Sequence, residues 1–307
     1  MFAVSWLTLR QLTVDGFFRG CSYGLLGVGF AIILGVTGRF HFAYGFTYTL
    51  SVYLAFTFTF RGLKLPFWPA AILAVLLTAC LGAGIERVVY RPLAANAGAT
   101  ALLAIFVAAL GLGIAGENII RLFWGSQSQA YFGPTKKAIN WWDTIFVNFD
   151  VWQAASGVVI VVILTLMLRF TSLGRRIKAT RSNPDLARTI GINAENTYVI
   201  CFFIGTFCAA VSAIWYGLKF NVDPAIGSSP VIYSFVVAFL AGTASSPIRV
   251  FITGIIVALI EQYSSIWLSV RWTQTAVFVV LVGYLSMLAF RQSAFRAKFR
   301  SLNLARD

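Results

Sequence analysis

Long apolar stretches alternate with short polar segments along most of this chain. A transmembrane helix needs ~20 predominantly apolar residues to cross the hydrocarbon core, and nine stretches reach or approach that length. They are Gly16–Val36, Phe40–Phe60, Phe67–Ile85, Thr100–Ile120, Val151–Phe170, Thr197–Leu218, Val231–Thr243, Val250–Leu268 and Thr275–Phe290. The pattern predicts an all-α fold: a polytopic transmembrane helix bundle of eight or nine spans, forming a single domain over residues 1–307.

Two of these stretches are expected to be broken or re-entrant helices. Phe40–Phe60 opens with polar and small residues, among them His41 and Tyr44. Val231–Thr243 is short for a full span. Non-helical backbone at membrane depth is tolerated only where protein or water covers it. We therefore expect protein or water to cover the freed backbone of both segments.

The start of the chain does not have the layout of a signal peptide. Arg10, Asp15 and Arg19 interrupt the apolar run within Met1–Gly20. This pattern favours a short interfacial helix that leads into the first span.

The longest connection on the predicted outer side is Phe123–Asp150, which contains Trp141 and Trp142. Its aromatic pair suits an interfacial helix on the outer leaflet. An ordinary loop whose aromatic side chains pack on neighbouring helices explains the pattern equally well.

Composition supports the membrane assignment. Hydrophobic residues make up 59% of the chain, charged residues only 11%, and the mean hydropathy is +0.82. A soluble domain carries roughly 25% charged residues. With fewer than half as many, this chain needs membrane lipid as its solvent.

The distribution of basic residues predicts an orientation. The net charge is +14, but the lysines and arginines lie in short connections rather than in one patch, which argues against a nucleic-acid partner. They concentrate in Glu86–Ala97, in Thr171–Asn196 and after Phe290, which fall on one side if nine spans alternate. By the positive-inside rule that side is the cytoplasm. The C-terminus is then cytoplasmic and the N-terminus external.

The residues needed for catalysis are missing from the sequence. His41 is its only histidine, so neither a histidine metal site nor a Ser/His/Asp triad can be assembled. A GxxxxGK[ST] phosphate loop is also missing. The sequence therefore predicts no catalytic residue, no metal site and no cofactor, and a membrane-embedded enzyme is a poor interpretation.

Small residues in the apolar stretches are interpreted as packing positions. Gly24, Gly27, Gly29 and Gly35 recur at helical spacing, which allows close contact between helices. The four cysteines lie in apolar segments without a CxxC motif and are expected to be small buried side chains. They are Cys21, Cys80, Cys201 and Cys208.

Two carboxylates fall inside predicted spans. Glu261 lies midway along the eighth stretch beside Gln262, and Glu117 lies near the outer end of the fourth. An ionisable group in lipid is costly and faces a cavity or a partner. For Glu261, lining a solute path and pairing with an arginine of another helix are equally good interpretations. For Glu117, whose position is close to the interface, a structural pairing is favoured.

A second informative feature is the basic segment Gly174–Asn196. Asn183 suits a helix N-cap, Pro184 suits the first helical position, and Gly191 suits a C-cap. The segment predicts a short amphipathic helix between two spans. That helix either floats on lipid headgroups or docks a cytoplasmic subunit.

Several motifs occur in an order that resembles a known family. The segment GRRIKATRSNPDLARTIGIN is followed by a helix of small residues and by NVDPAIG at Asn221–Gly227. Earlier come GRFHFAYG at Gly38–Gly45 and ERVVYRPL at Glu86–Leu93, and Glu261 follows in LIEQYSS. Together they resemble the branched-chain amino acid class of ABC importer permeases.

The chain departs from the family pattern at several positions. The family usually has Asn at the position of His41 and His at that of Tyr44. Pro247 and Arg249 replace small residues in a usually Gly-rich turn. These departures leave the fold intact and the solute open.

The resemblance implies a subunit of a heteromeric importer in the bacterial inner membrane. Its partners would be a second related permease subunit, two cytoplasmic ATPase subunits that hydrolyse ATP, and a periplasmic solute-binding protein. The family's solutes include branched-chain and other hydrophobic amino acids, urea and short amides. A secondary carrier or channel without ATPase partners is the main alternative.

The resemblance also implies roles for particular residues. The helix Asn183–Gly191 would be the coupling helix that sits on an ATPase, and Glu261 would lie on the translocation path. The residues assigned to the ATPase-coupling helix are Arg181, Asn183, Pro184, Asp185, Leu186, Arg188 and Gly191. Those assigned to the path are Glu261, Gln262, His41 and Tyr44.

Overall fold

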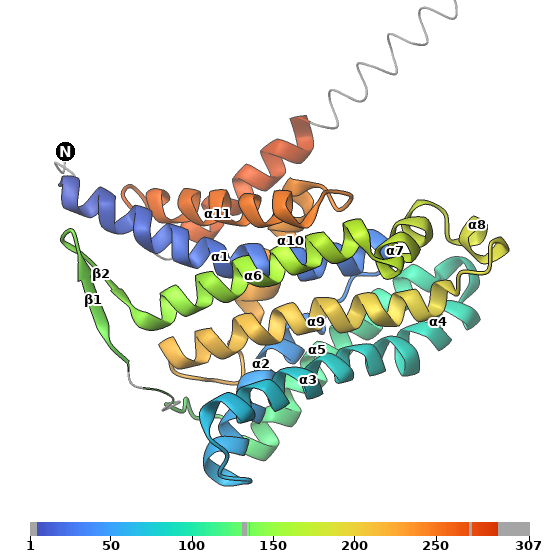
Figure 1. Cartoon of the computed structure of the whole chain (residues 1–307), viewed down its shortest axis with the longest axis horizontal. Coiled ribbons are helices and arrows are strands. Elements are labelled where there is room, and N and C mark those ends of the chain that lie inside the picture. The colour runs from blue at the N-terminus through green and yellow to red at the C-terminus, as the bar shows by residue number, and fades with distance from the viewer. Residues whose placement is uncertain (1–4, 131–133, 135, 270–271, 288–307) are drawn as a thin grey trace, which may run out of the picture.

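The computed structural model describes residues 5–130, 134, 136–269 and 272–287. Helices dominate it (Figure 1). They are α1 (Trp6–Thr37), α2 (Tyr44–Phe56), α3 (Phe67–Ile85), α4 (Arg91–Asn96), α5 (Ala101–Trp124), α6 (Asn148–Phe170), α7 (Ser172–Ser182), α8 (Pro184–Thr189), α9 (Ala194–Lys219), α10 (Ser228–Ala241) and α11 (Pro247–Ser264). Short π-helical turns extend α2 (η1, Thr57–Arg61) and α3 (η2, Glu86–Tyr90), a 3-10 turn (η3, Gly98–Thr100) precedes α5, and an apolar helix covers Trp272–Met287.

The all-α, polytopic prediction is confirmed. Six helices are long and apolar enough to cross a membrane, namely α1, α3 together with its continuation to Asn96, α5, α6, α9 and α11. Each corresponds to one predicted span. The last predicted span corresponds to the helix Trp272–Met287, and its expected end at Phe290 lies outside the described residues.

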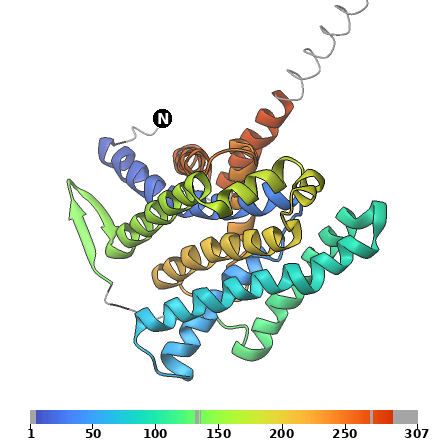
Figure 2. The same cartoon turned by 45° about the vertical axis from the view of Figure 1, so that its right-hand side comes forward.

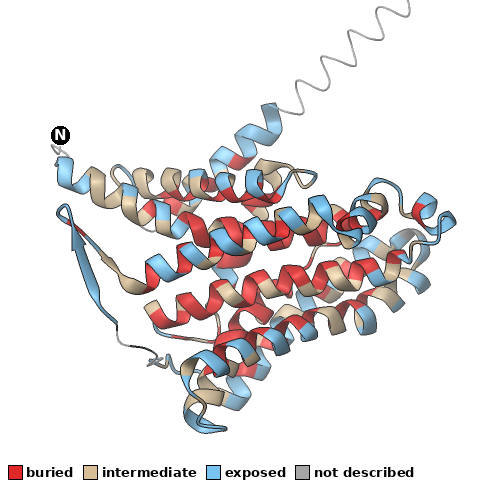
Figure 3. Cartoon of the chain, in the orientation of Figure 1, coloured by how far each residue is buried: buried red, intermediate tan, exposed pale blue. Residues whose placement is uncertain are grey.

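The two remaining predicted spans are short helices, as their polar or brief sequences indicated. Gly38 ends α1 in the left-handed conformation, at φ 67°, and α2 starts only at Tyr44. The second short helix, α10, has 14 residues. Both helices are largely buried by their neighbours (Figure 3). Protein therefore covers the interrupted backbone beside them, as a membrane interior requires.

The helices form two similar halves that run in opposite directions. A long helix, a short helix and two further helices occur first as α1, α2, α3 and α5, and again as α9, α10, α11 and Trp272–Met287 (Figures 1 and 2). Helices α1 and α3 of the first half both pack on α9 of the second half. Helix α11 of the second half packs on α1 of the first. The arrangement is an inverted repeat of the kind that many transporter folds contain.

Two pairs of glycines join the halves at equivalent positions. A Cβ atom on Gly29 would lie 2.6 Å from the Gly205 carbonyl oxygen, and one on Gly205 would lie 2.7 Å from the Gly29 carbonyl oxygen. The ends of the short helices meet in the same reciprocal way, at Gly45 and Gly227. Such contacts need residues without a Cβ atom, which confirms the packing role predicted for the glycines of α1.

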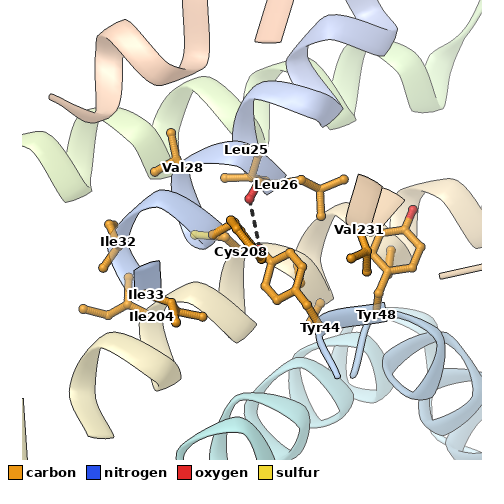
Figure 4. Close-up of a cluster of buried hydrophobic side chains, with 14 of the residues drawn as sticks. Leu25, Leu26, Val28, Ile32, Ile33, Tyr44, Tyr48, Ile204, Cys208 and Val231 are labelled. Atoms are coloured by element: carbon orange, nitrogen blue, oxygen red, sulfur yellow. Dashed lines mark hydrogen bonds between the residues drawn. The ribbon is translucent and has the colours of Figure 1, made fainter. Parts of the chain in front are cut away.

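The core lies where α1, α2, α9 and α10 come together (Figure 4). Tyr44 reaches into it, and its hydroxyl donates to the main-chain carbonyl oxygens of Leu26 and Gly205, each at 3.1 Å. Aliphatic side chains such as Ile33 and Val28 fill the space around it. The polar hydroxyl therefore has partners inside an otherwise apolar cluster, which avoids the cost of burying it alone.

The outer faces of the bundle are apolar. The sides of α3, α5 and α6 that face away from the core carry exposed leucine, isoleucine and valine side chains. In a soluble protein such a surface would be an aggregation hazard, whereas here it suits contact with lipid. Cys80 lies on this surface, so the expectation that all four cysteines are buried is wrong for this residue.

Two expectations about connecting segments are corrected. Residues from Trp6 onward belong to α1 itself, so a separate interfacial helix does not precede the first span within the described residues. The connection between α5 and α6 contains an antiparallel hairpin, β1 (Ala138–Trp141) and β2 (Thr144–Val147), instead of an interfacial helix. Trp141 and Trp142 stack on each other and remain exposed.

Candidate functional site

A cavity of about 570 Å³ lies between α1, α6, α9, α10 and α11, towards the hairpin end of the bundle. Its lining is polar for the interior of a membrane protein. The ionisable lining residues include Asp15, Arg19, Asp150, Lys219 and Glu261. Because ionisable groups are costly in lipid, such a cluster makes this cavity the candidate site of the bundle.

Glu261 is one of two buried carboxylates that line this cavity, the other being Asp150. One Glu261 carboxylate oxygen accepts a hydrogen bond from the Tyr233 hydroxyl at 2.7 Å and lies 3.5 Å from the Arg19 guanidinium. The other oxygen has no protein partner. Glu261 therefore pairs with an arginine of another helix, as one of the two interpretations expected, and it also lines the cavity. That the solute passes through this cavity stays a prediction.

Aromatic and ionic contacts hold the cavity walls together. The Tyr23 and Tyr233 rings stack with their centroids 4.2 Å apart, joining α1 to α10. Asp150, at the start of α6, pairs with Lys219 at the end of α9 across 2.6 Å. The cavity is thus lined by paired charges and aromatic faces.

The other two residues predicted for the path lie elsewhere. His41 and Tyr44 are buried inside the bundle and do not line this cavity. The His41 ring lies among Tyr44, Tyr90 and Phe202, and its Nδ1 is 2.9 Å from the Tyr90 hydroxyl. Of the four residues predicted for the path, Glu261 and Gln262 line this cavity, whereas His41 and Tyr44 do not.

The motifs GRFHFAYG and ERVVYRPL form one buried cluster. Arg39, from the first, makes an ion pair with Glu86, from the second, and both side chains are almost fully buried. The Arg39 guanidinium also lies over the Tyr198 ring, 5.1 Å from its centroid. Glu86 belongs to the π-helical turn η2, a feature that often occurs at functional sites. The sequence contained both motifs but gave no signal that they touch.

The basic segment forms two short helices at the opposite end of the bundle, which we call the α8 end (Figure 1). Asn183 caps α8 as expected, because its side-chain oxygen accepts hydrogen bonds from the main-chain NH groups of Asp185 and Leu186, both at 3.0 Å. Pro184 occupies the first turn. Gly191, with φ 82°, follows the end of the helix. The local helix prediction is therefore confirmed.

Charged contacts fasten α8 to its surroundings. Arg188 bonds both to Asp185 of α8, at 3.1 Å, and to Glu195 of α9, at 2.9 Å. Glu195 also lies 3.4 Å from Arg91 of α4. The two basic segments predicted to share one side of the membrane therefore meet at the same end of the bundle.

Glu117 pairs with Arg121 of its own helix at 2.5 Å. Both side chains are partly exposed. This pairing agrees with the structural interpretation favoured for Glu117.

A bundle of spanning and interrupted helices around a polar cavity defines a multi-pass membrane protein of the transport class. The family model for the branched-chain amino acid transport system / permease component matches residues 12–289. The chain therefore belongs to this family of permease components of ABC transport systems, as its motifs indicated.

Individual relatives agree with the family assignment. The chain is 27% identical, over 90% of its length and 92% of the relative, to the high-affinity branched-chain amino acid transport system permease protein LivH of Salmonella typhimurium. It is 29% identical, over 89% of its length and 92% of the relative, to the corresponding permease protein BraD of Pseudomonas aeruginosa. The solved structure of PsaBC from Streptococcus pneumoniae in complex with Fab is similar with a TM-score of 0.51 at 12% identity, covering 89% of each chain, and supports the fold alone.

Proposed function

We propose that the chain is the translocation subunit of an ABC importer in the bacterial inner membrane. It would work with a second related permease, two cytoplasmic ATPase subunits that hydrolyse ATP, and a periplasmic solute-binding protein. Its solute would be small and polar, of the branched-chain or hydrophobic amino acid, urea or amide type. The observation that carries the proposal is a capped, exposed helix at the basic end of a bundle whose family consists of permease components.

We assign ATPase docking to α8 and place the α8 end in the cytoplasm. The assignment rests on two exposed apolar side chains, Leu186 at 63% and Ile190 at 68% exposure, on a segment that otherwise carries charged and polar groups. An amphipathic helix that inserts its apolar residues in a groove is a recurring mode of protein recognition. Arg188 and Asn183 hold α8 in place, so docking does not have to order it first.

We assign the solute path to the polar cavity, with Glu261 and Gln262 on it. The support is a buried carboxylate that keeps one oxygen without a protein partner beside a cavity of about 570 Å³. This volume exceeds that of one amino acid side chain and lies in the range of small-molecule sites. Replacing Glu261 by Gln keeps the shape of the side chain, removes the charge and exchanges one acceptor oxygen for an NH2 donor.

ATPase docking is tested by co-purification with candidate ATPases encoded beside the permease. Leu186→Glu together with Ile190→Glu places two charges in the proposed interface and should abolish association. Thr100→Glu, at an exposed position near the start of α5, is the control and should leave association unchanged. If association survives the double substitution, α8 is not the docking helix.

The energy source is tested in proteoliposomes that contain the chain, its ATPases and the binding protein. Solute uptake should require ATP and all these components. Uptake without ATPase subunits would favour the secondary carrier or channel instead. Glu261→Gln should impair uptake while the complex still assembles; loss of assembly would show that Glu261 serves packing.

A further inference from the structure

Arg181 connects the segment that carries α8 to α10. It lies in the last turn of α7, and its guanidinium Nη2 donates a hydrogen bond to the main-chain carbonyl oxygen of Thr243 at 3.0 Å. Thr243 belongs to the short connection between α10 and α11. Arg175 and Arg176 of the same helix are exposed, whereas Arg181 is partly buried. Arg181 is therefore the arginine of α7 that points into the protein.

Helices α7 and α8 are joined without a flexible linker. The Asn183 main-chain NH bonds to the Ala179 carbonyl oxygen at 3.1 Å and so closes α7. The side-chain oxygen of the same residue caps α8. Because one residue ends one helix and starts the next, a displacement of α8 carries α7, and with it Arg181.

The Thr243 carbonyl group also packs against α1. A Cβ atom on Gly35 of α1 would lie 2.4 Å from this oxygen, so α1 passes against it. The preceding residue, Gly242, has φ 81°, a conformation that favours glycine. The end of α10 is thus confined between α1 and Arg181, next to a residue that can absorb a change in backbone angle.

The remainder of α10 leads to the polar cavity. Ser229, Pro230 and Tyr233 line the cavity, and Tyr233 donates its hydrogen bond to Glu261. A helix of 14 residues is about 21 Å long. One short helix therefore connects the Arg181 contact at the α8 end with the cavity.

We propose that the hydrogen bond between Arg181 and Thr243 transmits movement of α8 to α10, and hence to the cavity wall. The proposal rests on the proposed function, in which an ATPase moves α8. The other anchor of α8, the contact between Arg188 and Glu195, has the Arg188 side chain 51% exposed. Exposed ion pairs contribute little because water and salt screen them. The partly buried bond of Arg181 is the contact able to transmit movement directly to α10.

The bond is maintained at every physiological pH. Burial lowers the pKa of the Arg181 guanidinium, but the ordinary value is so high that the group stays protonated. A hydrogen bond from a charged donor is stronger than one between neutral groups. The Arg181 contact is therefore not a pH switch, and the transmission of movement should depend on the guanidinium group itself.

The test compares transport with ATP hydrolysis in one preparation of the full complex in proteoliposomes. Arg181→Gln removes the charge and shortens the side chain. The resemblance assigned Arg181 to the coupling helix, but the structure places it in α7, outside α8, with its guanidinium bonded to Thr243 inside the protein. ATPase association and hydrolysis should therefore stay within about twofold of the wild type, while uptake per ATP hydrolysed falls at least about fivefold, the lower range of allosteric coupling. Arg181→Lys should restore part of the uptake, because it keeps a charged donor. Arg249→Gln, at an exposed arginine of α11, is the charge-matched control and should change neither quantity.

Hydrogen exchange measures the transmitted movement itself. In the wild-type complex, adding ATP should change amide exchange in Ser228–Ala241, and Arg181→Gln should abolish this change while α8 still responds. The proposal is overturned if Arg181→Gln transports normally. It is also overturned if association, hydrolysis and uptake fall together, because Arg181 would then serve docking or folding. A wild-type complex that shows no ATP-driven uptake would refute the proposed function instead.

Discussion

Removing one member of the buried ion pair between Arg39 and Glu86 should strongly destabilise the protein. The two side chains are 7% and 1% exposed, and one Glu86 carboxylate oxygen has no other protein partner. Arg39→Met would leave the Glu86 charge buried without its counter-ion. Breaking a buried pair in this way costs about 3–5 kcal/mol of unfolding free energy.

Replacing both members should be far less harmful. In Arg39→Met with Glu86→Leu, two apolar side chains of comparable length replace the pair, and such exchanges are often neutral or stabilising. We therefore expect the double variant to recover most of the loss caused by Arg39→Met. The coupling between the two positions should exceed about 2 kcal/mol, at the upper end of values measured for residues in contact.

An exposed pair provides the matched control. Glu117 and Arg121 are 30% and 44% exposed, so neither charge is enclosed in the protein interior. Glu117→Gln should change the unfolding free energy by no more than about 1 kcal/mol.

The assay is reversible unfolding of the purified protein in mixed micelles with increasing dodecyl sulfate, followed by tryptophan fluorescence and circular dichroism. The free energies are compared at one detergent composition. The reasoning is refuted if Arg39→Met lies within about 1 kcal/mol of the wild type. It is equally refuted if the double variant loses the sum of the two single effects, because the charges would then act independently.

Three further predictions concern packing and capping. Gly82→Ala should lower the unfolding free energy by about 1–3 kcal/mol, because its Cβ atom would lie 2.0 Å from the buried Thr206 hydroxyl oxygen; Gly84→Ala, two residues away with open space around it, should be harmless in the same dodecyl sulfate titration. Asn183→Ala should weaken α8 by about 0.5–2 kcal/mol, seen as faster hydrogen exchange at the Asp185 and Leu186 amides while exchange in α9 stays unchanged. Tyr44→Phe should cost about 1 kcal/mol, because the hydroxyl that bonds to Leu26 and Gly205 is lost; an unchanged thermal midpoint in detergent would contradict this.

The sequence predicted the spanning helices because lipid imposes a simple constraint. Every backbone polar group inside a membrane must be satisfied locally, so long apolar stretches become helices. The same constraint predicted that α2 and α10 are interrupted helices, since a stretch that is polar or short cannot cross the membrane alone. The predicted ends of α8 were also correct, because Asn183, Pro184 and Gly191 each satisfy a specific backbone requirement at a helix end.

The hairpin between α5 and α6 escaped prediction for a local reason. Its turn residues, Trp142 and Asp143, have φ values of 50° and 59°. A two-residue turn with both φ values positive usually contains Asn-Gly or Asp-Gly. Trp-Asp carries no such signal, and the aromatic pair suited an interfacial helix and an ordinary loop equally well.

The buried cluster of Arg39 and Glu86 escaped prediction for a different reason. The two residues are 47 positions apart, and their contact depends on how α1 and α3 are placed by the rest of the bundle. In the sequence, Arg39 and Glu86 appear only as members of two separate motifs, GRFHFAYG and ERVVYRPL. Only tertiary packing turns them into an internal pair, and no periodicity in the sequence encodes that.

The inverted repeat makes the position of α8 informative. The segment of α7 and α8 precedes α9, the first helix of the second half. Under the proposed function, ATPase movement therefore enters the second half, through Arg181 to α10. The first half then receives it where the short helices touch, at Gly45 and Gly227. The two backbones approach closely there because neither glycine has a Cβ atom, and the Gly227 main-chain NH also donates a hydrogen bond to the Thr49 hydroxyl of α2 at 3.1 Å. Under the proposed function, these contacts would carry movement of α10 to α2.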